Sequence, residues 1–218
     1  EIFNNSKTLS NEAESEFPEG ITGLTFSMSS NIGSALAVKQ CFSLEPQKFL
    51  DGLQKIGVTN PLGVNLVGEG APQVYTSVGE GAWSGLSLTQ MAIGYEVTQT
   101  PLQTLALYSA VANNGVMMKP VFVTETRRKG ETVSEFAPQV VNDRICSSKT
   151  LDACKKMMES ACIPGGEGTA ANIFKTSPYT VAGKTGTCKI ANNGSYDEGR
   201  YRASFTGYFP AEDPVYSC

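Results

Sequence analysis

Histidine is absent from this chain of 218 residues, and its absence excludes several kinds of active site at once. A Ser-His-Asp triad, a Cys-His pair and a histidine-ligated metal centre cannot be built. Any general base must therefore be a lysine, a carboxylate or a tyrosine. The six cysteines form no Cys-x-x-Cys pair, so we expect no zinc site.

Long apolar runs and an excess of positive charge are also missing. No apolar run approaches the roughly 18 residues of a membrane span, and no signal peptide is visible. The net charge of −4 provides no basic surface for nucleic acid. The chain does contain 40% hydrophobic and 17% charged residues, which predicts a folded core and argues against disorder.

The length fits one domain or a large part of one. Residues 1–20 are polar and acidic, and we expect a loop there, followed by a partial domain over residues 21–218. The chain opens at Glu1, and a strand that begins at Val215 stops at Cys218. We therefore expect a fragment of a longer protein.

The spacing of apolar residues predicts several helices and one irregular region. Ser29 or Ser30 can cap the first helix and Ser43 the second. Thr100-Pro101-Leu102-Gln103 has the pattern of a capping box with proline at the first helical position. Residues 57–85 are rich in glycine and proline, which predicts an extended loop. The expected helices cover residues 32–40, 44–56, 100–112 and 148–162.

The last forty or so residues read as β structure because β-branched and aromatic residues alternate with small or polar ones. We expect a strand over 179–189 to pair with a strand over 202–209, with Asn192-Asn193-Gly194 and Asp197-Glu198-Gly199 in the connection. Two shorter strands are expected over residues 121–127 and 131–136.

The first of these β segments contains Lys184-Thr185-Gly186-Thr187. Lys184 provides a fixed positive charge, and the hydroxyls of Thr185 and Thr187 can bind a substrate carboxylate. Gly186 has no side chain, so a ligand can lie against the backbone like an added strand. The N–H of Thr187 is then placed to stabilise an oxyanion. The alternative is an ordinary surface strand.

A second motif, Ser29-Ser30-Asn31, has the form Ser-x-Asn. Ser29 could relay a proton with a lysine as base, and Asn31 could bind an amide of the acyl donor. The alternative is a helix cap. Lys-Thr-Gly and Ser-x-Asn accompany Ser-x-x-Lys in the serine enzymes that react with penicillin. No lysine of this chain has a serine three residues before it.

Several segments resemble class B penicillin-binding proteins, the monofunctional peptidoglycan transpeptidases, and they follow that family's order from about residue 21 to 218. Order and spacing together are more specific than any single motif. The segments are Met28-Ser29-Ser30-Asn31-Ile32-Gly33, Gly94-Tyr95-Glu96, Thr100-Pro101-Leu102-Gln103, Ala112-Asn113-Asn114-Gly115 with Pro120, Gly168-Thr169-Ala170, Ala182-Gly183-Lys184-Thr185-Gly186-Thr187 and Phe205-Thr206-Gly207-Tyr208-Phe209-Pro210.

The resemblance implies a mixed α/β (α+β) transpeptidase fold, shared with serine β-lactamases, in which helices flank an antiparallel sheet that is incomplete here. It implies that a serine of Ser-x-x-Lys attacks the D-Ala-D-Ala bond of a stem peptide. A neighbouring stem's amine then accepts the acyl group, and β-lactams acylate the same serine. By the same resemblance, Ser29, Asn31 and Lys184 would be catalytic, and Thr185, Gly186 and Thr187 would bind substrate.

The missing Ser-x-x-Lys is a departure from the family, in which that motif precedes Ser-x-Asn. The chain therefore lacks the nucleophile, the general base and half of the oxyanion hole. We expect this chain alone neither to turn over substrate nor to be acylated by penicillin.

The resemblance also implies a parent protein anchored by an N-terminal helix at the periplasmic face of the cytoplasmic membrane. Its role would be cell-wall synthesis in division or cell-shape maintenance, with a cell-wall glycosyltransferase partner and no metal, cofactor or nucleic acid. The alternatives are a serine β-lactamase, a D,D-carboxypeptidase, and a non-catalytic β-lactam sensor or pseudoenzyme. The Thr-Pro-Leu-Gln and Gly-Tyr-Glu segments favour a transpeptidase over a β-lactamase.

Overall fold

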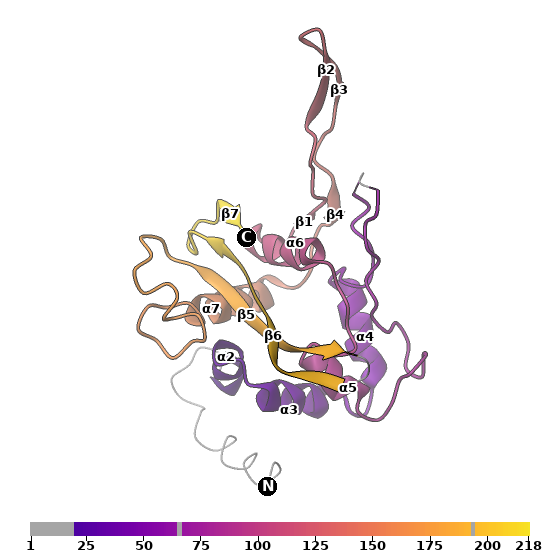
Figure 1. Ribbon diagram of the computed structural model, residues 1–218, viewed down its shortest axis with the longest axis vertical. Helices are drawn as coiled ribbons and strands as arrows, with labels where there is room; N and C mark the ends of the chain where they lie inside the picture. Colours follow the sequence, from indigo (N-terminus) through magenta and orange to yellow (C-terminus); the bar gives the residue numbers. More distant parts are fainter. Residues whose placement is uncertain (1–19, 65–66, 193–194) are drawn as a thin grey trace. The chain divides into compact units, whose positions relative to one another are not determined.

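A computed structural model describes residues 20–64, 67–192 and 195–218 of the chain (Figure 1). The chain divides into two compact units. Unit 1 comprises Glu1–Ala37 and Asp152–Cys218, and unit 2 comprises Val38–Leu151. The expected loop over residues 1–20 lies outside the described residues except for Gly20, which begins a helix. That residues 21–218 form one partial domain stays a prediction.

Unit 1 contains the three-stranded sheet of the C-terminal region, with strand order β5-β6-β7 and antiparallel pairing throughout. Its strands are β5 (Ala182–Asn192), β6 (Ser195–Phe209) and β7 (Tyr216–Ser217). The expected pairing of two long strands is confirmed. Asp197-Glu198-Gly199 was expected in the connection but lies within β6, because both strands run further than predicted.

Three helices contribute to unit 1: α2 (Gly20–Ser27), the first part of α3 (Asn31–Phe42) and most of α7 (Ser148–Ser160). The expected helices over 32–40 and 148–162 correspond to α3 and α7, whereas α2 was not predicted. The core includes Ala161, Cys162 and Ala170, which are at most 1% exposed. Partly buried side chains from α2, the segment after α7 and the sheet pack against these three, namely Phe26, Phe174, Val181 and Phe205.

Small residues allow the backbones in this core to approach closely. A Cβ added to Gly168 would lie 2.4 Å from the carbonyl oxygen of Ala161. The amide of Ala170 donates a 3.0 Å hydrogen bond to that same carbonyl. Residues 168–170 are therefore held tightly against the end of α7, and only glycine fits at position 168 without a backbone shift.

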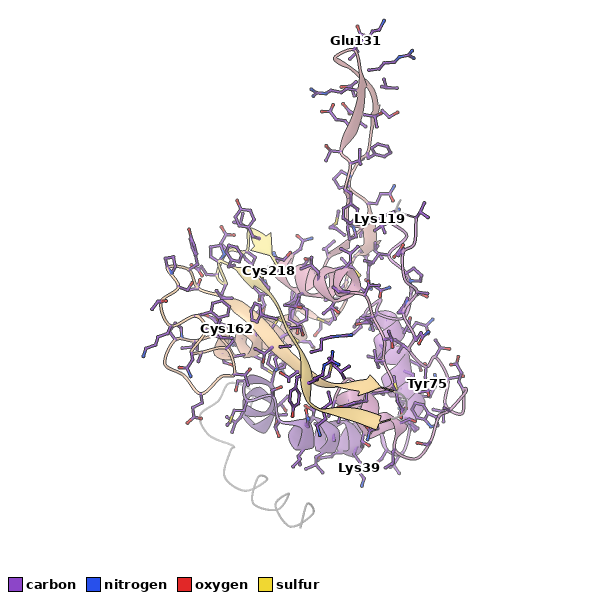
Figure 2. All side chains as sticks on the ribbon, in the orientation of Figure 1. Lys39, Tyr75, Lys119, Glu131, Cys162 and Cys218 are labelled. Atoms are coloured by element: carbon purple, nitrogen blue, oxygen red, sulfur yellow. The ribbon has the colours of Figure 1, made fainter. Side chains whose placement is uncertain are left out.

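Unit 2 contains α4 (Pro46–Lys55), α5 (Ser87–Ala92) and α6 (Pro101–Ala112). The β1 (Met117–Met118) and β4 (Val140–Asn142) strands pair, and between them β2 (Glu125–Arg128) and β3 (Glu131–Glu135) form a hairpin. Figure 2 shows Lys119 near the base of this hairpin and Glu131 near its tip.

The start of α6 confirms the predicted capping box. The Thr100 side chain accepts a hydrogen bond from the Gln103 amide, and the Gln103 side chain accepts one from the Thr100 amide. The predicted start of the helix expected over residues 44–56 is wrong: Glu45, not Ser43, is the N-cap residue of α4, and Pro46 occupies the first turn. Proline has no N–H to lose at a helix start, and its fixed φ favours the helix from that point.

Candidate active site

The Ser-x-Asn motif lies in the short turn between α2 and α3. Ser29 has a positive φ of 56°, which is uncommon for a residue other than glycine. Ser30 is the residue that caps α3, because its Oγ accepts a 3.1 Å hydrogen bond from the Gly33 amide. Ser29 and Asn31 are both exposed, and neither side chain forms a hydrogen bond with any described residue. The cap and the candidate relay are therefore different serines.

Lys184, Thr185, Gly186 and Thr187 all lie on β5, which is an edge strand of the described sheet. This confirms the expected strand and its edge position. Gly186 is opposite Ser204 of β6, and a Cβ added to Gly186 would meet only the Ser204 side chain, 2.6 Å from its Oγ. Among the described strands β5 pairs with β6 alone, so its other edge is free for a ligand that adds along it.

The ammonium of Lys184 is half-buried and fixed by close contacts. Its Nζ donates a 2.9 Å hydrogen bond to the carbonyl of Thr185 and lies 3.5 Å from the Thr185 hydroxyl. It also lies 5.9 Å from the centre of the Phe26 ring, within the range of a cation–π contact. Burial lowers the pKa of Lys184, and the neighbouring Cys162 partly opposes that change.

Cys162 lies in the core of unit 1, just beyond the end of α7 (Figure 2), and interacts electrostatically with Lys184. Burial raises the pKa of its thiol to about 11, although a hydrogen bond from the Gly183 backbone and the charge of Lys184 act in the opposite direction. The group is therefore a neutral thiol at neutral pH. None of the six cysteines, all of which are among the described residues, forms a disulfide bond.

Thr169 connects the two motifs, although no individual role was predicted for it. Its amide donates a 3.0 Å hydrogen bond to the carbonyl of Ser27, two residues before Ser29. Its hydroxyl lies 2.7 Å from the hydroxyl of Thr185. The fold of unit 1 thus brings the Ser-x-Asn turn and the Lys-Thr-Gly strand to the same loop, although no described hydrogen bond joins Ser29 or Asn31 directly to Lys184.

This arrangement can bind an anionic, acceptor-rich group. It offers the ammonium of Lys184, the neighbouring hydroxyls of Thr169 and Thr185, and the edge of β5. Together these groups suit a carboxylate at the end of an extended peptide. Within the described ranges, no group of three histidine, cysteine or acidic side chains could hold a metal ion. The described helices also include none long and apolar enough to cross a bilayer.

Comparison with known proteins identifies the family. The family model described as "Penicillin binding protein transpeptidase domain" matches residues 15–218. The chain is 31% identical over 211 residues to penicillin-binding protein PbpB of Mycolicibacterium smegmatis, covering 91% of this chain and 30% of that protein. It is 28% identical over 193 residues to peptidoglycan D,D-transpeptidase FtsI of Escherichia coli K12, covering 87% of this chain and 29% of that protein.

Solved structures agree with this assignment. Penicillin-binding protein 3 from Mycobacterium tuberculosis, in complex with aztreonam, matches with a TM-score of 0.77 and 29% identity. The match covers 92% of this chain and 44% of that one. The same protein in complex with ampicillin gives a TM-score of 0.76.

The fold is therefore that of a penicillin-binding protein transpeptidase domain, with mixed helices and antiparallel sheet, as the resemblance implied. The chain belongs to the penicillin-binding protein transpeptidase domain family. It spans about 30% of the length of the first curated relatives that it matches.

Proposed function

We propose that this chain is the part of a serine D,D-transpeptidase that carries the Ser-x-Asn and Lys-Thr-Gly motifs. The whole protein would cross-link peptidoglycan stem peptides through a serine acyl-enzyme. The FtsI relative is named a peptidoglycan D,D-transpeptidase, and penicillin-binding protein 3 of M. tuberculosis was solved in complex with the β-lactam aztreonam. The proposal rests on the two hydrogen bonds of Thr169. Its amide bonds to Ser27, just before the Ser-x-Asn motif, and its hydroxyl bonds to Thr185 of the Lys-Thr-Gly motif.

The proposed roles follow from the chemistry of each group. Lys184 supplies positive charge toward the C-terminal carboxylate of the donor peptide, and Thr185 and Thr187 donate hydrogen bonds to it. Gly186 lets the peptide backbone approach β5. The N–H of Thr187 supplies one donor of the oxyanion hole, which stabilises the charge that develops when the D-Ala-D-Ala carbonyl is attacked.

Ser29 and Asn31 act on the other side of the reacting bond. Ser29 passes a proton toward the departing D-Ala amine, and Asn31 donates to or accepts from the amide of the acyl donor. The nucleophile and its lysine base belong to a Ser-x-x-Lys segment outside this chain. This chain alone is therefore inactive, and the reaction needs both parts of the domain.

The setting follows from the substrate. Stem peptides lie outside the cytoplasm, so the whole protein would work at the periplasmic face of the membrane, anchored by a helix outside this chain. A cell-wall glycosyltransferase would supply the glycan strands that carry the stems, and β-lactams would acylate the same serine.

The test is a donor–acceptor assay on the complete protein with a synthetic stem peptide ending in D-Ala-D-Ala. The proposal predicts D-Ala release coupled to a cross-linked product. The Lys184→Met variant should lose about 100-fold in rate, a typical effect of removing a transition-state donor. Lys189→Met is the matched control, because Lys189 lies on the same strand and is exposed.

Other outcomes would identify the alternatives. D-Ala release without a cross-linked product would indicate a carboxypeptidase, and rapid turnover of a β-lactam would indicate a β-lactamase. Binding of a β-lactam without any peptide product would indicate a sensor. Equal rates for the two lysine variants would remove the role proposed for Lys184.

A further inference from the structure

The hydroxyls of Thr169 and Thr185 share one hydrogen bond, which uses only one of their two protons. Their oxygens are 2.7 Å apart, so one hydroxyl donates its proton to the other. The Thr185 oxygen also lies 3.5 Å from Lys184 Nζ, a group that can only donate. Whichever threonine donates within the pair, one of the two protons is not used inside it.

The unused proton is accessible to a ligand. Thr169 is exposed and Thr185 is partly exposed, and the Thr185 hydroxyl lies 3.5 Å from the ammonium of Lys184. A proton donor next to a positive charge favours a ligand group that accepts hydrogen bonds and carries negative charge. A terminal carboxylate has both properties, because an ionised carboxylate only accepts.

The position of Thr169 is fixed by its backbone. Its amide is bonded to the Ser27 carbonyl, and the next residue, Ala170, is fully buried and bonded to Ala161. The residue before it, Gly168, packs against the same Ala161 carbonyl. The Thr169 hydroxyl is thus presented from a rigid loop, which reduces the entropy lost when it orients Thr185.

We propose that Thr169 is a positioning and specificity residue, whose hydroxyl directs the Thr185 hydroxyl toward the carboxylate of the ligand. The proposal rests on the function proposed above and adds a residue to its carboxylate site. Thr169→Val keeps the shape and the backbone bonds but removes the hydroxyl, and Thr169→Ser keeps the hydroxyl.

The experiment measures acylation of the complete protein by ampicillin and by the methyl ester of ampicillin, in which the carboxylate is neutral. Thr169→Val should lower the acylation efficiency with ampicillin about tenfold, because a Thr185 hydroxyl that is no longer oriented loses its hydrogen bond to the charged carboxylate, and the loss should be in binding. With the ester, the same variant should lose less than about twofold. Thr169→Ser should behave like the wild type with both compounds.

The ratio of the two compounds is taken on one protein sample, so a change in the amount of folded protein cancels. Thr132→Val is the matched control, because Thr132 also forms one exposed side-chain hydrogen bond, 2.9 Å to Glu125, on the hairpin of unit 2. Its ratio should equal that of the wild type. If Thr169→Val lowered the acylation efficiency equally with both compounds, or with neither, the role of Thr169 would be overturned and the proposed function would stand. A wild-type protein that ampicillin does not acylate would overturn the proposed function and the inference together.

Discussion

Lys184 Nζ lies 5.9 Å from the centre of the Phe26 ring, and this contact links the Lys-Thr-Gly strand to the helix that ends just before Ser29. Phe26 also packs against the buried core of unit 1. An aromatic ring anchored in the core therefore supports the ammonium from one side, while the Thr185 carbonyl accepts its hydrogen bond. The lysine is placed by packing as well as by its position on the strand.

Substitution of Ser30 should affect stability, whereas substitution of Ser29 should affect catalysis. Ser30→Ala should lower the free energy of unfolding by about 1 kcal/mol, because the cap of α3 is lost. Ser29→Ala should change it by less than about 0.5 kcal/mol, because the Ser29 side chain bonds to no described residue. Urea unfolding measures both.

The same pair should behave in the opposite way in β-lactam acylation of the complete protein. Ser29→Ala should slow it by about 100-fold or more, the usual effect of losing a positioned proton-transfer group. Ser30→Ala should leave it near the wild-type rate. A normal rate in Ser29→Ala would remove the proposed relay.

Gly168→Ala should destabilise the protein by about 1–3 kcal/mol, because the new Cβ would lie 2.4 Å from the Ala161 carbonyl oxygen. The matched control is Gly52→Ala in α4, where the added Cβ would meet nothing within 4 Å beyond its chain neighbours and the backbone of its own helix. Alanine favours a helix over glycine, so that control should gain up to about 1 kcal/mol. Equal effects of the two substitutions in urea unfolding would contradict the close packing of residues 168–170.

Tyr208 is fully buried, and its hydroxyl has no hydrogen-bond partner among the described residues. Burial, with smaller contributions from Glu159 and neighbouring thiols, raises its pKa to about 12. Tyr208→Phe removes an unsatisfied polar group and should leave stability unchanged or raise it by about 1 kcal/mol. Tyr201→Phe, at an exposed position of β6, should change nothing measurable. A loss above about 1 kcal/mol in Tyr208→Phe would mean that the hydroxyl is bonded.

The buried thiol of Cys162 should lower the free energy of unfolding as the pH becomes alkaline. Its pKa is about 11 in the folded protein against an ordinary value of 9.0, so its contribution is fully present below pH 9 and is lost as the pH rises to 11. The lowered pKa of Lys184 acts in the opposite direction, because the folded state releases that proton first. Between pH 9 and 11, the wild type should lose about 2 kcal/mol more than Cys162→Ala. Parallel pH curves for the two proteins would exclude this role of the thiol.

Local patterns predicted the elements that local interactions determine. The capping box at Thr100 was predictable because both of its hydrogen bonds join residues three apart. The pairing of β5 with β6 followed from alternation in two neighbouring segments. In contrast, α4 begins at Pro46 because proline restricts the residue before it, an effect that outweighed the capping preference of Ser43.

The features that depend on tertiary contacts were not predictable. The α2 helix carries no strong periodic pattern, and Phe26 and Ser27 take their places from contacts with the core and with Thr169. The expected turn at Asp197-Glu198-Gly199 is inside β6, where Gly199 has a φ of 76° and the pairing register shifts between Lys189 and Ala191. Both Thr169 and Thr185 lie in segments that resemble the family, but the hydrogen bond between their hydroxyls joins residues 16 apart and was not predictable from either segment.

The most direct test of the central claim is the intact mass of two proteins after incubation with ampicillin: this chain alone, and the complete protein that also contains the segment before it. We predict one covalent ampicillin adduct on the complete protein, at a serine outside this chain, and none on the chain alone. An adduct on Ser29, or no adduct on either protein, would contradict it.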